Sequence, residues 1–383
     1  MKKSEMIQLL MDVMSLPSVN CSDDEGKVAE YLCNYFNRSG ISSKIDRIDD
    51  KHANVIAYLD GDDKSQTEIW NGHLDTVPYG SLEDWNTDPS KPVLDDKEEI
   101  LYGRGASDMK SGLCAMVFAL CEHKKSGKRT PHPIMFIGTC DEEKTGIGAS
   151  QIERDGLIGS CRRILIGEPT GMKLGMAQKG CIWIELQIHG KTCHGAYPEQ
   201  GCSAVEYGWV ISHRLKAWIE AHSHHLLGKS TANITKIAGG TAPNMIPETC
   251  TLLIDVRVVP GITDEIVQAK LEEIINEEEK NASSALRAEF RFINNRRAIE
   301  IEKDAALVQK MEHCLKIEGI VPEPLGINYF TDASILVRDC PEAEVLLFGP
   351  GEPSMAHKPN ECVHLDKYEK AVRILEYMIT CEN

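Results

Sequence analysis

The sequence predicts an α/β domain with a largely parallel sheet, interrupted by an inserted ferredoxin-like α+β unit. Short apolar strands alternate with helices in the first part of the chain, which is typical of a parallel sheet. The order strand, helix, strand, strand, helix, strand then follows, and α/β signals resume after it. We therefore expect residues 1–176 and 294–383 to form one domain, and residues 177–293 to form the insert. A chain of 383 residues also favours two domains.

The α/β part is expected to open with two amphipathic helices. Met6 and Leu9 mark the apolar face of the first helix. The second is expected from Ser22 to Gly40, where Ser22 and Glu25 predict a capping box. Further helices are expected near residues 113–122, 305–315 and 366–379. The predicted strands are short apolar runs at Val55–Leu59, Glu68–Trp70, Ile134–Gly138, Ile164–Ile166 and Val345–Phe348.

The insert begins with a run of alternating apolar and polar residues. From Ile182 to Ile188 every second residue is aliphatic, which predicts a half-buried strand. A helix follows around Ala204–Leu215, and a later one is expected to be capped by Thr263. The other predicted strands of the insert are Asn233–Ile237, Thr249–Val258 and Leu286–Ile293.

The composition argues against two classes of partner. The formal net charge is -17 and the pI is about 5.3, so the chain repels phosphate backbones and nucleic acid is not expected. No stretch is long and apolar enough to suggest a membrane span. The fourteen cysteines form no CxxC pair, and several lie inside apolar segments, which is typical of a reducing compartment. We expect a soluble cytoplasmic protein.

Candidate metal ligands follow the predicted strands, where open α/β sheets place their sites. His73 comes just after the strand that ends at Trp70, and Asp75 can bond its second ring nitrogen. A surface histidine beside an aspartate is the simpler alternative. Asp108 follows two glycines and precedes a helix, where an N-cap aspartate is the alternative.

Acidic residues follow two further strands, and a second histidine lies near the end of the chain. Asp141, Glu142 and Glu143 would repel one another unless they are solvated or bind a cation. Glu168 closes a strand, and His357 lies in the last motif. Nitrogen and oxygen ligands suit Zn²⁺, for which Co²⁺ or Mn²⁺ can substitute. Three carboxylates and one bridging hydroxide would balance two dications, so we expect two ions per chain.

These five motifs, in this order, resemble those of the two-zinc deacylases and exopeptidases. That family includes acetylornithine deacetylase, succinyl-diaminopimelate desuccinylase, aminoacylase and glutamate carboxypeptidase, and the resemblance covers essentially the whole chain. It implies that one zinc is held by His73, Asp108 and Glu168, and the other by Asp108, Glu143 and His357. Asp75 would orient His73, and Glu142 would serve the bridging hydroxide as general base and then general acid. The family's unusual peptide bond would fall at Asp108–Met109.

The resemblance also implies that the insert is a lid through which two chains form a homodimer. His194 would reach the active site of the partner subunit and stabilise the oxyanion, although a lone loop histidine is more often only a surface residue. Asn244 follows a glycine-rich loop and would bind substrate. Arg257 resembles the family's carboxylate clamp, and an exposed Asp255–Arg257 pair is the alternative.

The expected reaction is metal-dependent hydrolysis of the amide bond of a small N-acyl amino acid. Glu168, in place of aspartate, resembles the deacylases more than the dipeptidases. Thr331 and Asp332 would line the pocket, but Ala333 follows them where succinyl-specific members have arginine, which argues against a succinyl substrate. A zinc dipeptidase or carboxypeptidase is the first alternative. An inactive protein that binds an amino acid or a metal is the remote one.

Overall fold

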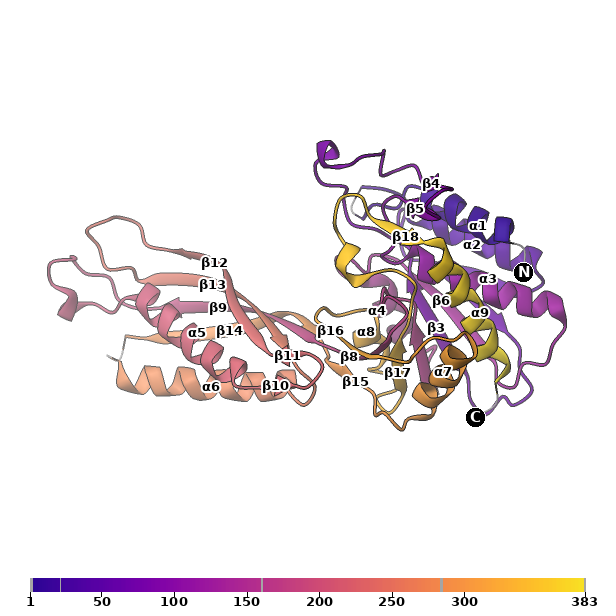
Figure 1. Ribbon diagram of the computed structural model, residues 1–383. Helices are drawn as coiled ribbons and strands as arrows, with labels where there is room; N and C mark the ends of the chain where they lie inside the picture. The colour runs from indigo at the N-terminus through magenta and orange to yellow at the C-terminus, as the bar shows by residue number, and fades with distance from the viewer. Residues whose placement is uncertain (1–2, 21, 160, 283–284, 382–383) are drawn as a thin grey trace. The chain divides into compact units, whose positions relative to one another are not determined.

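The computed structural model describes residues 3–20, 22–159, 161–282 and 285–381, and the chain divides into two compact units. The first contains Met1–Met176, Ile301–Leu325 and Thr331–Asn383. The second contains Ala177–Glu300 and Gly326–Phe330. Our expected boundary after residue 293 falls inside a strand of the second unit, which continues to Arg296. The fold is nonetheless an α/β domain interrupted by an α+β insert (Figure 1).

A largely parallel sheet forms the centre of the first unit, with the strand order β1-β2-β6-β3-β7-β17-β8. β3 pairs in parallel with β6 and β7, and β7 with β17, whereas β1, β2 and β8 pair antiparallel at the sides. Every residue of β3 is buried, as expected for a central strand covered on both faces. The bounds are β1 Ser42–Arg47, β2 Ala53–Leu59, β3 Glu68–His73, β6 Ile134–Thr139, β7 Arg163–Ile166, β8 Leu174–Gln178 and β17 Glu344–Leu347.

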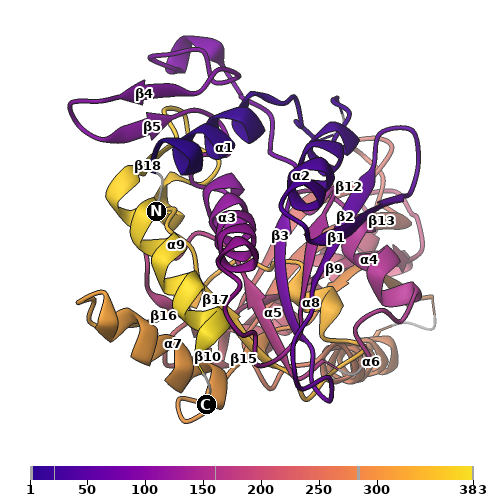
Figure 2. The same ribbon diagram turned by 90° about the vertical axis from the view of Figure 1, so that its right-hand side faces the viewer.

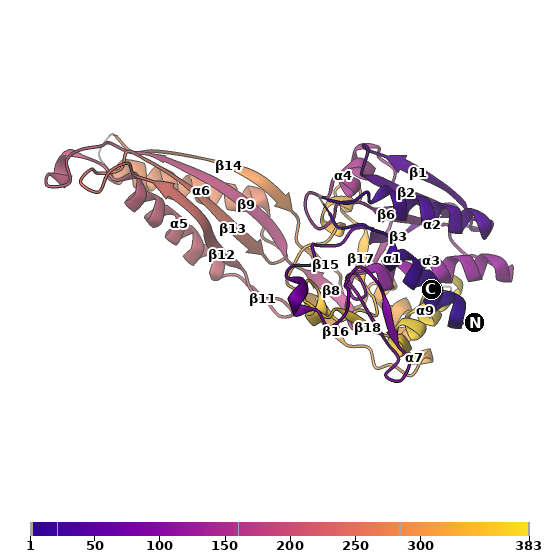
Figure 3. The ribbon, with the colours of Figure 1, turned by 90° about the horizontal axis from the view of Figure 1, so that it is seen from above.

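Helices cover both faces of this sheet. Figure 2 shows α3 and α9 on one side of β3, and α4 and α8 on the other, and Figure 3 shows α3 and α4 on opposite sides of β3 from above. A small separate sheet, with the order β18-β5-β4, lies near α1 (Figure 2). The helices are α1 Lys3–Ser15, α2 Gly26–Arg38, α3 Lys110–Ser126, α4 Ile147–Arg154, α7 Ala306–Ile317, α8 Ala333–Leu336 and α9 Leu365–Thr380. The small strands are β4 Val93–Asp95, β5 Ile100–Tyr102 and β18 Cys362–His364, and β16 is Pro324–Ile327.

The second unit is a four-stranded antiparallel sheet with two helices. Its strand order, β12-β13-β9-β14, is that of a ferredoxin-like unit. The helices pack on one face of the sheet, where alternate residues such as Ile184, Leu186 and Ile254 form a closed apolar core. The elements are β9 Gly180–His189, α5 Ala204–Glu220, β12 Thr231–Gly239, β13 Thr249–Val258, α6 Asp264–Asn281, β14 Arg287–Arg296, and the short strands β10 Ser223–His224, β11 Gly228–Lys229 and β15 Ile299–Glu300.

Two predictions about helix ends have opposite outcomes. Thr263 caps α6, because its hydroxyl accepts a hydrogen bond from the backbone N–H of Ile266, as predicted. The capping box at Ser22 and Glu25 is wrong: α2 begins only at Gly26, and the Ser22 hydroxyl donates to the carbonyl of Val19. None of the helices in the described residues is long and apolar enough to cross a membrane.

Candidate metal centre

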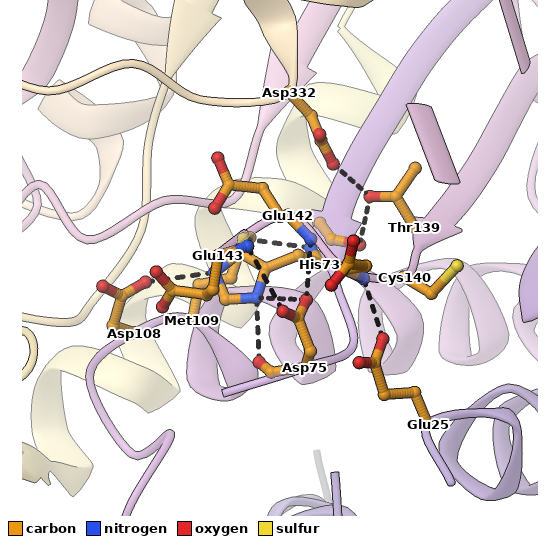
Figure 4. Close-up of polar contacts among 12 residues, drawn as sticks. Glu25, His73, Asp75, Asp108, Met109, Thr139, Cys140, Glu142, Glu143 and Asp332 are labelled. Atoms are coloured by element: carbon orange, nitrogen blue, oxygen red, sulfur yellow. Dashed lines mark hydrogen bonds and ion pairs between the residues drawn. The ribbon is translucent and has the colours of Figure 1, made fainter. Parts of the chain in front are cut away.

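Three parallel strands bring candidate ligands to one edge of the central sheet. His73 is the last residue of β3, Glu142 and Glu143 follow β6, and Glu168 follows β7. Because neighbouring parallel strands end at the same edge, residues far apart in sequence come together there. Figure 4 shows His73, Asp108 and Glu143 grouped at this edge. The structure therefore brings together residues from four of the five predicted motifs, and His357 joins them through Glu143.

The His73 ring is held with one nitrogen toward the backbone and the other toward carboxylates. The ring is 1% exposed, and Nδ1 donates to the backbone carbonyl of Asp75 at 2.9 Å. Nε2 lies 3.1 Å from Asp108 Oδ1 and 3.9 Å from Glu168 Oε1. In a neutral ring this arrangement leaves the Nε2 lone pair free for a metal ion. Asp75 thus fixes the ring mainly through its main chain, while its Oδ1 lies 3.5 Å from Nδ1.

Asp108 lies in a loop held by a buried carboxylate from the end of the chain. Glu361 is fully buried, and its Oε1 accepts the backbone N–H groups of Ser107 and Asp108 at 2.8 and 2.9 Å. Its Oε2 accepts from Arg104 at 2.7 Å. The peptide bond between Asp108 and Met109, where the resemblance implied an unusual bond, is cis.

Sequence reasoning assigned no role to Arg104 or Glu361. No pattern in the sequence marks a charged residue as buried, and these two are separated by 257 positions. The sequence offers one signal for Arg104: it lies in the same short loop as Asp108.

His357 faces the other side of the Asp108 carboxylate. Its Nε2 lies 2.9 Å from Glu143 Oε2 and 3.5 Å from Asp108 Oδ2. The hydrogen bond to Glu143 raises the pKa of His357, although partial burial opposes the shift. Asp108 therefore lies between two histidines, one at each carboxylate oxygen, which is the arrangement expected of a bridging ligand.

The electrostatics of the cluster fit a bound cation. Burial, and then repulsion by Asp108, raises the pKa of both Glu143 and Glu168. Burial lowers the pKa of His73, but the hydrogen bonds to Asp108 and Asp75 and the charges of Asp75 and Glu168 together raise it by more, so the net shift is upward. Without a metal, the protonated forms of these groups are therefore favoured relative to the same groups in water. Ligand atoms of His73, Asp108 and Glu143 all lie within 4.8 Å of one another, close enough to hold one ion.

Glu142 lies on the same turn as Glu143 but in a different environment. Its pKa is raised well above the usual range by burial, and next by repulsion from Asp332 and Glu168. Among the described residues, none donates a hydrogen bond to its carboxylate, which carries no dashed line in Figure 4. A carboxylate with a raised pKa and free oxygens has the properties of a general base.

Two of the predicted lid residues are neighbours within the second unit. The backbone N–H of Gly195 donates to the carbonyl of Asn244 at 2.8 Å, and His194 pairs with Met245 in an isolated β-bridge. His194 is exposed, and its Nδ1 accepts from the N–H of Ala196 at 3.1 Å. The proton of the neutral ring is therefore on Nε2, which can donate a hydrogen bond.

Arg257 is paired within its own sheet. Its Nε and Nη2 donate to the two carboxylate oxygens of Asp255 at 2.7 and 2.9 Å, and its guanidinium lies 5.6 Å from the ring centre of Phe330. This is the Asp–Arg pair that the sequence left open as an alternative. A role for Arg257 in binding a carboxylate stays a prediction.

Thr331 and Asp332 are buried near the ends of the central strands. Asp332 is 3% exposed, and its Oδ2 accepts from the Thr139 hydroxyl at 2.5 Å. Thr331 is 1% exposed, and its hydroxyl accepts from the N–H of Ala333 at the start of α8. Asp332 influences the site through its charge on Glu142, and substrate contact by either residue stays a prediction.

Comparison with known proteins yields one family. The profile of peptidase family M20/M25/M40 matches residues 69–380. A probable succinyl-diaminopimelate desuccinylase of Staphylococcus aureus is 28% identical over 98% of this chain and 96% of its own length. An acetylornithine deacetylase of Myxococcus xanthus is 30% identical over 84% of this chain and 82% of its own length.

Solved structures share the whole fold at low sequence identity. A tripeptidase of Staphylococcus aureus superposes with a TM-score of 0.78 at 20% identity, covering 99% of this chain and 98% of its own. A dinuclear metal-binding peptidase from the M20 family of Bacillus subtilis gives a TM-score of 0.75 at 14% identity, with coverage of 99% and 98%. At sequence identities of 20% and 14%, these structures show a shared fold and nothing more.

Proposed function

Because the chain belongs to peptidase family M20/M25/M40, we propose that this metal-dependent amidohydrolase is a deacylase that hydrolyses the amide bond of a small N-acyl amino acid. The main support is a cluster at the carboxyl edge of the parallel sheet, in which His73, Asp108 and Glu168 are buried, Glu143 is half-buried and His357 is exposed. The two curated relatives described above are named as a desuccinylase and a deacetylase, which supports removal of an acyl group.

The donor set fits two divalent ions that share Asp108. His73 and Glu168 would complete one ligand set, and Glu143 and His357 the other. Imidazole and carboxylate donors suit Zn²⁺, with Co²⁺ or Mn²⁺ as substitutes. When bound, such a metal pair polarises the scissile carbonyl and lowers the pKa of a water molecule.

Glu142 would move the protons of the reaction. Its unpaired carboxylate can take a proton from the attacking water and deliver it to the nitrogen of the leaving amine. The first transfer requires an ionised carboxylate, and cations bound nearby would favour that form. Asp75 would support this role, because its Oδ1 accepts the backbone N–H of Glu142 at 3.1 Å.

Metal removal and a substrate panel test this proposal. Dialysis against a chelator should abolish activity, and Zn²⁺, Co²⁺ or Mn²⁺ should restore it. The panel should contain N-acetyl and N-succinyl amino acids, dipeptides and tripeptides. Faster turnover of the N-acetyl compounds is expected, whereas preference for peptides would support the exopeptidase alternative. Full activity in metal-free protein would exclude both metal-dependent reactions. That zinc is the native metal and that the protein is located in the cytoplasm stay predictions.

A further inference from the structure

Four consecutive backbone N–H groups lead from β6 into the turn that carries Glu142 and Glu143, and buried side chains accept all four. Asn54 Oδ1 accepts from Cys140 at 3.1 Å, and Glu25 Oε2 accepts from Asp141 at 2.7 Å. Asp75 accepts the last two, with Oδ1 taking Glu142 at 3.1 Å and Oδ2 taking Glu143 at 3.2 Å. We call Glu25, Asn54 and Asp75 the acceptor cradle (Figure 4 shows Glu25 and Asp75).

The cradle is built from three separate elements. Glu25 immediately precedes α2, Asn54 lies on β2, and Asp75 follows β3, and the side chains of all three are fully buried. Placing two carboxylates and an amide beneath a turn costs free energy unless their hydrogen bonds are made. The four N–H groups lie beyond Thr139, the last residue of β6, so the strand pairs of the sheet do not include them and these side chains supply the acceptors.

The turn needs external support because its backbone is unusual. Asp141 has a φ of 56°, in the left-handed region that residues other than glycine rarely adopt. Such a conformation persists when the surroundings fix it, and it is common at active sites. Inside the turn, the carbonyl of Asp141 accepts from Gly146, and its carboxylate accepts from Thr145. Glu25 holds the same residue from beneath, through its N–H.

We propose that Glu25 is a positioning residue for the reaction, acting through Asp141 to set the Glu142 and Glu143 carboxylates. This inference rests on the proposed function. The reason is the direction of the contacts: Glu25 fixes the residue just before the proposed base, while Asp75 fixes the base and the proposed metal ligand. Loss of one acceptor would let Asp141 relax and would displace both carboxylates together. Displacements of about 1 Å in such groups cost roughly 10²-fold in rate.

The experiment compares two substitutions of similar size in the full chain. Glu25→Gln keeps an oxygen that can accept from Asp141, whereas Glu25→Met keeps the volume and removes the acceptor. We expect Glu25→Met to lower kcat by about 10-fold to 10²-fold with KM changed less than about threefold. It should also weaken Zn²⁺ binding by about 10-fold, measured by competition with a chromophoric chelator, as loss of a ligand's support usually does. Glu25→Gln should keep both kcat and the affinity for Zn²⁺ within about threefold of wild type.

Glu30→Ala, on the helix that begins directly after Glu25, is the matched control. Glu30 is exposed and pairs with Arg47 at the surface, so this change should leave kcat, KM and metal affinity unaltered. If Glu25→Met does not fold, Glu25→Asp replaces it, because the shorter side chain withdraws the carboxylate from the Asp141 N–H; its kcat should then fall while the protein stays folded.

The outcomes separate the two proposals. Wild-type kcat and metal affinity in a folded Met or Asp variant would overturn the role of Glu25, while chelator-sensitive deacylation would leave the proposed function intact. Failure of both the Met and the Asp variants to fold would also overturn it, because Glu25 would then be required for stability alone. Equal loss of kcat in the Gln variant would mean that the hydrogen bond to Asp141 is not the cause.

Discussion

Adjacent acids in the turn after β6 are expected to differ in function. Glu143 contacts His357 and lies beside Asp108, whereas the Glu142 carboxylate has no hydrogen-bond donor among the described residues. We predict that Glu142→Ala keeps the fold and both metals but lowers kcat by at least ~10²-fold, the usual value of a positioned proton shuttle. Glu143→Ala should instead lose metal, which elemental analysis of the dialysed protein would measure. Metal loss in Glu142→Ala alone would mean that the two roles are exchanged.

The buried charges also predict how pH affects the metal-free protein. The pKa values of Glu143 and Glu168 are raised in the folded state, so above about 4.5 the folded protein binds more protons than the unfolded chain. His73 and His357 act in the same direction above 6.5, because their pKa values are raised too. The free energy of unfolding of the metal-free protein must therefore fall as pH rises from the ordinary pKa of each group through its raised pKa in the folded state.

Thermal unfolding of metal-stripped protein between pH 5 and pH 8 tests this sign. We expect Tm to decrease across the range in the metal-free wild type, and to decrease less in a Glu143→Gln, Glu168→Gln double variant, in which two of the groups no longer titrate. Added metal should flatten the profile, because it binds the deprotonated ligands. A Tm that rises with pH in the metal-free wild type would contradict the electrostatic account.

The structure also explains why the residues around the metal ligands were not predicted. His73, Asp108 and Glu143 could be found because their residue types follow predicted strands or glycine loops. Glu25 looked like part of a helix cap, but its carboxylate contacts Asp141, 116 positions away. Glu361 lies 253 positions from Asp108. Such partners are brought together only by the tertiary fold, and a single sequence carries no local pattern for them.

At the scale of elements, burial separates the strands that could be predicted from those that could not. β3, β6 and β7 are almost continuously buried and each contains an apolar run, and their predicted positions are confirmed to within three residues. β1 has the sequence SSKIDR and no fully buried residue, so nothing in its pattern indicates a strand. It exists because β2 offers it a paired edge. The small strands β4, β5 and β18 depend in the same way on one another.

The start of α3 packs against the loop that carries Glu168, and this contact depends on a glycine. A Cβ at Gly112 would lie 1.8 Å from the carbonyl oxygen of Gly167, the residue before Glu168. Alanine in a helix is normally favoured over glycine by about 1 kcal/mol. Here we predict the opposite: Gly112→Ala should lower Tm and weaken metal binding, because the backbone at Glu168 must move.

Gly159→Ala provides the comparison for this prediction. A Cβ at Gly159 would meet only the carbonyl of Gly156 at 3.9 Å, so Tm and metal affinity should be unchanged. Calorimetry with and without Zn²⁺ measures both quantities. An alanine at residue 112 that stabilises the protein, with unaltered metal binding, would show that the contact between α3 and the Glu168 loop is not rigid.

At the scale of the whole molecule, the second unit leaves apolar surface exposed. Ile234 and Ile237 on the edge strand β12 are 39% and 51% exposed, and Trp209 on α5 is 54% exposed. An open strand edge with apolar side chains invites pairing with another chain. A two-fold dimer would bury the same surface on both subunits. This exposed surface, together with the family resemblance, is the reason to expect a homodimer through the lid.

If the lid completes the site of the partner subunit, His194 and Glu142 can be supplied by different chains. Glu142→Ala lacks the proposed base but keeps a normal His194, and His194→Ala has the reverse defect. Neither homodimer should be active, but random mixing should give about half heterodimers, each with one complete site, and so about one quarter of wild-type activity. His189→Ala, at an exposed position of β9, is the control and should be active by itself. If heterodimers form, as mass spectrometry can show, and no activity returns, His194 acts within its own chain or has no role. An active monomer would exclude action between subunits while leaving the assignment of the metal ligands unchanged.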